Sequence, residues 1–195
     1  MDESLAKIRH DRSVKDFPGL RLEDDEYVEF YFRRAKVCLW AIWGGTFFGL
    51  VFILLAFLLV LLGQSRLDEM GVNFMYIILF ALLAAALLIC VISLKVYKGN
   101  KLFITNRRVI QFVMDSLVST SINIIDLVSI EDASFRQESL LQKMFHFGIL
   151  RLSTVGDETT YTFKYSDIKP EELKAVTDLI SQAKKANKLA KEDTP

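Results

Sequence analysis

The residue types that most often carry out chemistry are few in this chain, and they do not stand at catalytic or metal-binding spacing. His10 and His146 have no partner at such a spacing, and no zinc-protease, nucleophile-elbow or phosphate-loop motif occurs. Adjacent acids such as Glu131 and Asp132 would point to opposite faces of a strand, so they would not share a site. We therefore expect that the protein is not an enzyme and that it uses no cofactor, no metal and no small-molecule substrate.

The residues that could still bind a ligand are basic. A candidate site for anionic lipid head groups comprises Lys95, Lys98, Lys101, Arg107 and Arg108. Each positive charge near an anionic membrane surface contributes about 1 kcal/mol to binding. Two competing interpretations remain open: the charges fix membrane topology and solubilise a turn, or they contact a protein. The formal net charge of the chain is zero, so a nucleic-acid partner is not expected.

Two long uncharged runs come before this cluster in the sequence. Val37 to Leu62 and Gly71 to Leu94 contain no Asp, Glu, Lys, Arg or His. About 20 apolar residues in a helix span a bilayer, and neither run shows the polar face of a soluble core helix. The sequence therefore predicts a transmembrane hairpin with helices at 37–62 and 73–97 and an external loop at 63–72.

The distribution of Lys and Arg orients this hairpin. Basic residues flank its outer ends, with Arg33, Arg34 and Lys36 before the first run and the cluster above after the second. The connecting loop carries only Arg66, beside Asp68 and Glu69. By the positive-inside rule, the chain is predicted to be a multi-pass membrane protein with both termini in the cytoplasm.

Small residues recur on one face of each predicted membrane helix. The candidate packing face comprises Ala41, Gly45, Gly49, Ala81 and Ala85. Such residues let helices approach closely. Either the two helices pack together within one chain, or the face joins copies in a homo-oligomer or binds other membrane proteins. Because the runs lack ionisable residues, we expect an anchor and not a transport pathway.

The remaining chain is predicted to form a small β domain. Strands are expected at 101–105, 109–113, 118–124, 127–135, 148–155 and 160–165. Ser139 and Gln142 form a capping box that predicts a short inserted helix. Pro170 opens a terminal amphipathic helix with an apolar stripe of Leu173, Val176, Ile180 and Ala183. The domain is expected at 98–188, followed by a tail at 189–195.

The segment before the hairpin, residues 1–36, is predicted to be cytoplasmic. Its first part, residues 1–22, is polar, and much of it is expected to be mobile unless it docks on the β domain. Later in the same segment, residues 27–32 alternate between apolar and polar types. That pattern fits a short strand, and an amphipathic helical entry to the first crossing fits nearly as well. Both interpretations remain open.

These segments together resemble the bacterial pleckstrin-homology-like membrane proteins of the bPH2 (YdbS-like) type. The resemblance lies in E-D-D-E-Y-V-E-F-Y-F-R-R before the hairpin, L-F-I-T-N-R-R-V-I at 102–110, and the stretch from Ile130 to Leu152. One departure is His146-Phe147, where the family often has glycine and an aromatic residue. The resemblance implies a two-helix transmembrane hairpin plus a PH-like domain, a curved antiparallel sheet or barrel with a short inserted helix and a C-terminal amphipathic helix.

The resemblance also implies a non-enzymatic protein of the inner membrane, connected with the envelope or with stress. We expect a scaffold or protein-interaction module that presents its cytoplasmic domain at the inner leaflet. A sensor of anionic lipid head groups is the alternative. A remote alternative is an accessory subunit of a membrane enzyme or transporter.

Overall fold

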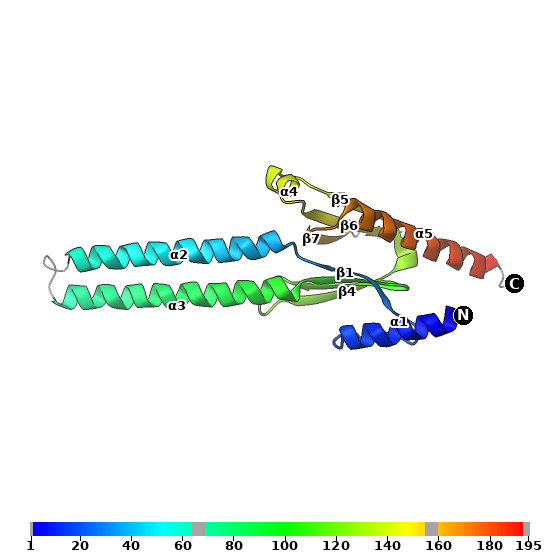
Figure 1. Ribbon diagram of the computed structural model, residues 1–195, viewed down its shortest axis with the longest axis horizontal. Coiled ribbons are helices and arrows are strands. Elements are labelled where there is room, and N and C mark those ends of the chain that lie inside the picture. Colours follow the sequence, from blue (N-terminus) through cyan, green and yellow to red (C-terminus); the bar gives the residue numbers. More distant parts are fainter. Residues whose placement is uncertain (1, 64–68, 155–159, 193–195) are drawn as a thin grey trace.

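The computed structural model describes residues 2–63, 69–154 and 160–192. The molecule is elongated, with a helical hairpin at one end and a β domain at the other (Figure 1). Helices α2 (Lys36–Gly63) and α3 (Glu69–Gly99) lie side by side and antiparallel. By length and composition, both are apolar enough to cross a membrane. Part of the predicted external loop, 64–68, lies outside the described residues, and residues 69–72 belong to α3.

The predicted small-residue face is only partly present at the contact between these helices. Ala41, Gly45 and Gly49 border a groove of about 320 Å³ together with Ala86, Cys90 and Ser93 of α3. Ala81 and Ala85 lie on the exposed side of α3 and do not pack against α2, so for these two residues the alternative of contacts between copies or with other membrane proteins stays open. The half-buried positions of α3 follow a different helical stripe, which includes Leu79, Leu83, Ala86 and Cys90.

The β domain contains two antiparallel sheets. The first has the order β1 (Val28–Arg33), β2 (Lys101–Thr105), β3 (Arg108–Met114) and β4 (Thr120–Asp126). The second has the order β5 (Ile130–Arg136), β6 (Gly148–Thr154) and β7 (Thr160–Ser166). The predicted turn at Gly156-Asp157 lies outside the described residues.

Of the two expected forms, a curved sheet or a barrel, the barrel is wrong for the part of the chain that the structure describes, because the strands there form two separate sheets and no closed barrel. A 3-10 turn, η2 (Leu127–Ser129), interrupts the chain between β4 and β5, so β4 and β5 do not pair. The sheets are joined on the other side by an isolated bridge between Arg34 and Ser166. The Gln111 side chain also donates a hydrogen bond of 2.8 Å to the Thr162 carbonyl oxygen.

Helix α5 (Pro170–Glu192) covers the open side, where it contacts β5 and η2. Its predicted apolar stripe is confirmed, because Val176 and Ile180 are buried in the core and Leu173 and Ala183 pack against it. The helix continues to Glu192, so residues 189–192 of the predicted tail are helical. The inserted helix α4 (Leu140–Met144) is also confirmed, with the capping box between Ser139 and Gln142.

The N-terminal segment is part of the β domain. Residues 28–33 form β1, which pairs with β2, so the strand interpretation is correct and the sheet extends beyond the predicted domain limits of 98–188. The preceding helix α1 (Asp2–Asp16) is tied to β1, because the Val28 amide donates to the Ser13 hydroxyl at 3.0 Å. Phe17 and Leu20 then pack on Phe103 at the outer face of the first sheet.

Candidate functional site

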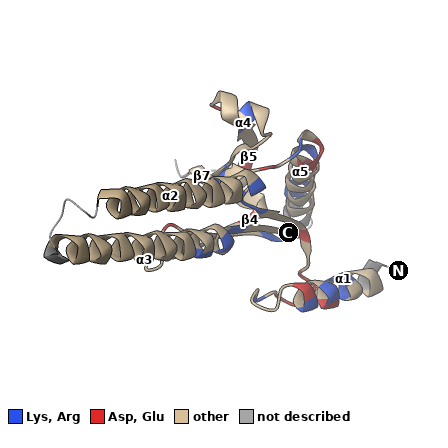
Figure 2. Cartoon of the chain, turned by 60° about the vertical axis from the view of Figure 1, so that its left-hand side comes forward, with Lys and Arg blue, Asp and Glu red and all other residues tan. Residues whose placement is uncertain are grey.

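The direction of β2 decides where the predicted basic cluster lies. Strand β2 begins at Lys101, directly after α3, and runs away from the hairpin to Thr105. At about 3.3 Å per residue, five residues carry the chain about 17 Å. We call the end where the chain enters and leaves the helices the hairpin end, and the opposite end the far end. Figure 2 shows blue segments gathered at the hairpin end.

The five candidates are therefore not one site. Lys95, Lys98 and Lys101 lie at the hairpin end, whereas the turn that carries Arg107 and Arg108 lies at the far end. The turn expected beside the helical hairpin therefore lies a strand's length away from it. The sequence pattern places Arg107 and Arg108 at a turn between two strands. The position of that turn relative to the helices depends on the length and direction of β2, which the pattern does not give.

Arg108 is engaged inside the protein. Its Nε donates to Oε1 of Glu26 at 2.9 Å and its Nη2 donates to Oε2 at 2.8 Å, a bidentate pair. The Glu26 side chain is fully buried, and that of Arg108 is 18% exposed. The Thr105 hydroxyl donates to the same carboxylate at 2.8 Å, and the Glu23 amide donates at 2.9 Å. A guanidinium held in this way is not free to bind a lipid phosphate.

The protonation of this pair follows from its surroundings. Burial raises the pKa of the Glu26 carboxyl, but the hydrogen bonds from Arg108, the Glu23 amide and Thr105 outweigh it and hold the pKa below the usual 4.5. Hydrogen bonding to Glu26 likewise raises the pKa of Arg108. Both groups therefore stay charged at neutral pH. Arg107 is half-exposed and makes only a longer ion pair, at 3.5 Å, with Glu23.

At the hairpin end, a pocket of about 360 Å³ lies between the chain that follows α1 and the outer face of the first sheet. Aromatic side chains line much of it, including Phe17, Tyr31, Phe103 and Phe112. Arg33 and Lys101 also line the pocket, and they are directly opposite each other in the pairing of β1 with β2. Like charges in that position repel, and Asp16, which also lines the pocket, can balance only one of the two positive charges. Arg33 was not predicted to belong to such a site, because the sequence left it open whether residues 27–32 form a strand or a helix.

The hairpin end is also where the helices are fixed to both sheets. The Ala35 amide donates to the Tyr165 carbonyl at the end of β7, and the Tyr97 hydroxyl donates to the Arg34 carbonyl at 3.2 Å. The Asn100 side chain donates to the carbonyls of Val96 and Met114, at 2.7 and 2.8 Å. The start of α2 and the end of α3 are thus tied to strands, so the domain has a defined orientation relative to the hairpin.

A second candidate surface is the outer edge of β4. In the described residues, β4 pairs with β3 over seven regular positions and with no strand on its other side. The ladders of the other edge strands, β1, β5 and β7, each contain a register irregularity, and β7 carries Lys164. Strand β4 has neither a bulge, a Lys nor a Pro, which are the usual protections of an edge. Its outward Ile122 and Ile124 are each 55% exposed.

Metal chemistry finds no support in the described ranges. No group of three or more His, Cys, Asp and Glu side chains there is placed to hold an ion. His10 instead contacts the Glu26 carbonyl oxygen through Nδ1 at 2.7 Å, which helps to dock α1. His146 ends the α4 segment with a φ of 53°, a left-handed conformation that glycine adopts without strain.

Two antiparallel sheets with a C-terminal helix over their open side define a PH-like domain, here joined directly to a helical hairpin. The family model for the bacterial PH domain, bPH_2, matches residues 45–184, and the chain belongs to that family. The match begins within α2 and ends within α5, so it includes most of the hairpin and most of the β domain.

One solved structure that resembles this chain is a DUF1696 family protein with a pleckstrin-homology domain from Shewanella loihica PV-4. The two are 12% identical, with a TM-score of 0.32, and the alignment covers 44% of this chain and 70% of the other. That likeness is too slight to define the fold, which the strand pairing establishes. Among curated proteins, no relative matches this chain.

Proposed function

We propose that this protein is a non-enzymatic interaction module anchored in the bacterial inner membrane, which offers the edge of β4 to a strand of a protein partner. In this proposal α2 and α3 cross the bilayer and both termini lie in the cytoplasm. Apart from half-buried positions along the contact with α3, the apolar side chains of α2 are exposed, and none is buried. A core helix of a soluble protein would bury that surface, whereas lipid covers it without cost.

The observation that carries the proposed interaction is the unprotected edge of β4. An added strand would pair with its free backbone groups, while Ile122 and Ile124 would pack against alternate side chains of the partner. Because α2 and α3 continue almost directly into β1 and β2, the first sheet is held close to the membrane. A partner paired with β4 would therefore be recruited to the inner leaflet.

The test is photo-crosslinking in native membranes. A photoreactive amino acid replaces Ile124 on β4 in one strain and Thr160, an exposed residue of the edge strand β7, in a matched control. The proposal expects a discrete adduct only from position 124, at twice the mass of the chain if the partner is a second copy. If position 124 gives no more adduct than position 160 does, the proposed interaction through β4 is contradicted. Release of the protein from membranes by alkaline carbonate contradicts the anchor.

A second function, contact with an anionic lipid head group, is favoured by the opposed charges of Arg33 and Lys101 beside their aromatic pocket. Lys95 and Lys98 lie on the adjoining last turns of α3 and add positive charge. The far-end residues Arg107 and Arg108 take no part in this version of the site.

A further inference from the structure

Two segments far apart in the sequence reach back to the hairpin end of the domain. Strand β3 returns from the far end, so the β3–β4 loop, residues 115–119, lies beside the last turns of α3. The bridge between Arg34 and Ser166 places the end of β7 at the hairpin end. The end of β5 and the start of β6 therefore also lie there, with α4 between them. Figures 1 and 2 show α4 and this loop on opposite sides of the hairpin.

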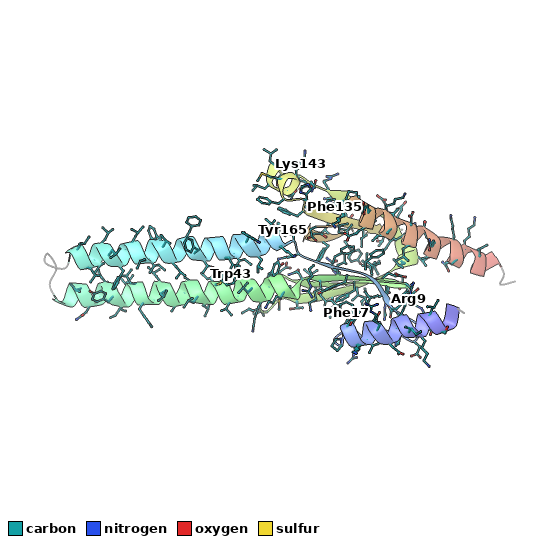
Figure 3. All side chains as sticks on the ribbon, in the orientation of Figure 1. Arg9, Phe17, Trp43, Phe135, Lys143 and Tyr165 are labelled. Atoms are coloured by element: carbon teal, nitrogen blue, oxygen red, sulfur yellow. The ribbon has the colours of Figure 1, made fainter. Side chains whose placement is uncertain are left out.

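Both segments carry large apolar side chains that are from about half to almost fully exposed in the described chain. In the loop, Val118 is 96% exposed and Leu117 is 47% exposed. Helix α4 exposes four large side chains that share one helical face by their spacing: Leu140, Leu141, Met144 and Phe145. Figure 3 shows the side chains of α4, with Lys143 labelled among them, standing out from the body of the protein.

Hydrogen bonds stabilise the orientation in which the apolar face of α4 is exposed. The Gln142 and Ser139 side chains cap its first turn. The Gln137 side chain donates to the carbonyls of Gln142 and Phe147, at 3.1 and 3.2 Å. Phe147, the next apolar residue, is buried. The segment is therefore built to present α4 outward and to bury the residue that follows it.

We infer that α4 and the tip of the β3–β4 loop insert shallowly into the cytoplasmic leaflet of the same membrane that the hairpin crosses. The inference rests on the proposed crossing by α2 and α3, because the hairpin then fixes the level of the bilayer surface. Apolar side chains at that level, next to the basic residues Lys98, Lys101 and Lys143, fit the boundary between acyl chains and anionic head groups.

The arrangement favours lipid over a protein partner as the occupant. The two apolar segments lie on opposite sides of the hairpin, so a single protein that covered both would have to pass around α2 and α3. A bilayer surrounds the hairpin on every side and reaches both segments at once. The insertion would give the domain three attachments to the membrane: the hairpin, α4 and the loop.

The experiment uses the full chain in vesicles that contain anionic lipid, with Cys38 and Cys90 replaced by Ala. A polarity-sensitive fluorophore is attached to a single new cysteine at Met144→Cys, at Val118→Cys, or at Leu189→Cys as the control. Leu189 is an exposed leucine near the far end of α5. Quenching by lipids that carry a nitroxide near the head group then reports the depth of each position. The only two tryptophans, Trp40 and Trp43, both lie on α2, so their quenching by brominated lipid reports the hairpin separately.

The inference expects blue-shifted emission and several-fold stronger quenching at 144 and 118 than at 189. If the tryptophans are quenched but 144 and 118 behave like 189, the inference is overturned and the anchor stands. A blue shift at 144 without quenching by lipid also overturns it, and assigns the face to a protein contact. If the tryptophans themselves are not quenched, the proposed anchor fails and the inference fails with it.

Discussion

The carboxylate of Glu26 and the guanidinium of Arg108, separated by 82 positions in the sequence, form a bidentate ion pair at 2.8 and 2.9 Å. The pair joins the acidic stretch before the hairpin to the N-R-R turn after it, so the chain on both sides of the two helices is fastened at the far end of the sheet. Breaking a buried pair by removing one partner leaves an uncompensated charge and costs about 3 kcal/mol or more.

We therefore expect Glu26→Ala to destabilise the domain strongly. A loss of about 3 kcal/mol corresponds to a fall in the thermal midpoint of roughly 6 to 12 °C for a chain of this size. Thermal unfolding of the full chain in mild detergent, followed by circular dichroism, measures it. The control is Arg107→Ala, which removes only an exposed ion pair and should shift the midpoint little. Equal shifts for the two variants would contradict the structural role of Glu26.

The same pair predicts a dependence on pH. The folded pKa of Glu26 is lowered below 4.5, so the folded state binds this proton less readily than the unfolded state does. The stabilisation from Glu26 is therefore complete above pH 4.5 and is lost as the pH falls through the folded pKa. Arg108, whose pKa is raised, stays charged throughout.

The measurement compares thermal midpoints of the wild type and Glu26→Gln from pH 7 down to pH 3. Other carboxylates titrate in both proteins, so the difference between the two isolates Glu26. That difference should be constant at neutral pH and should shrink below pH 4.5. A difference that grows on acidification would mean that the folded pKa of Glu26 is raised, contrary to the structure.

How much of this arrangement the sequence predicts depends on how local each feature is. The uncharged runs, the capping box of α4 and the apolar stripe of α5 are set by neighbouring residues, and they were predicted correctly. The joining of Glu26 to Arg108 was not, because it depends on β1 pairing with β2 across the whole hairpin. Six residues of alternating pattern do not distinguish a strand from a helical lead-in.

The grouping of all five candidate lipid-binding residues into one cluster was wrong for a related reason. Charge counting groups Arg107 and Arg108 with Lys95 and Lys98 because they are near in sequence, but a strand of five residues separates the two groups by about 17 Å. Likewise, the small residues of the hairpin were assigned by spacing alone. The rotation of α3 about its axis, which turns Ala81 and Ala85 outward, depends on side chains along its whole length.

The opposed charges at the hairpin end give a prediction for lipid binding. Arg33→Ala combined with Lys101→Ala should reduce the anionic lipid that co-purifies with the protein, because each charge near the surface contributes about 1 kcal/mol. Mass spectrometry of the lipids retained in mild detergent, at low and moderate salt, measures this. Arg107→Ala at the far end is the control and should leave retention unchanged. A loss with Arg107→Ala alone would restore the original assignment of the site.

The edge of β4 gives a prediction for association. Ile124→Lys places a charge at the centre of the exposed edge, which is how natural sheets prevent unwanted pairing. If β4 binds a second copy, the variant should run as a monomer in mass photometry of detergent-solubilised protein, at concentrations where the wild type is dimeric. Thr160→Lys on β7 is the matched control and should leave the mass unchanged. A wild type that is monomeric in several mild detergents would exclude self-pairing through β4.

Gly148, at the start of β6, lies in close contact with the neighbouring strand β5. A Cβ at Gly148 would lie 2.5 Å from the Arg136 carbonyl oxygen and 2.8 Å from the Phe135 ring. The carbonyl belongs to the neighbouring strand β5 and cannot move without disturbing its pairing with β6. We expect Gly148→Ala to cost about 1 to 3 kcal/mol, the usual range for overpacking, as measured by thermal unfolding.

Gly45 on α2 is the contrasting case, because a Cβ there would meet nothing within 4 Å. Gly45→Ala should therefore not lower the thermal midpoint and should raise it slightly, because alanine in a helix interior is more stable than glycine by about 1 kcal/mol. Gly45→Leu then separates the two interpretations of the small-residue face. A lower association between copies, at unchanged thermal stability, would assign the face to contacts between hairpins. A fall in stability without any change in association would instead show that the face supports packing within one chain.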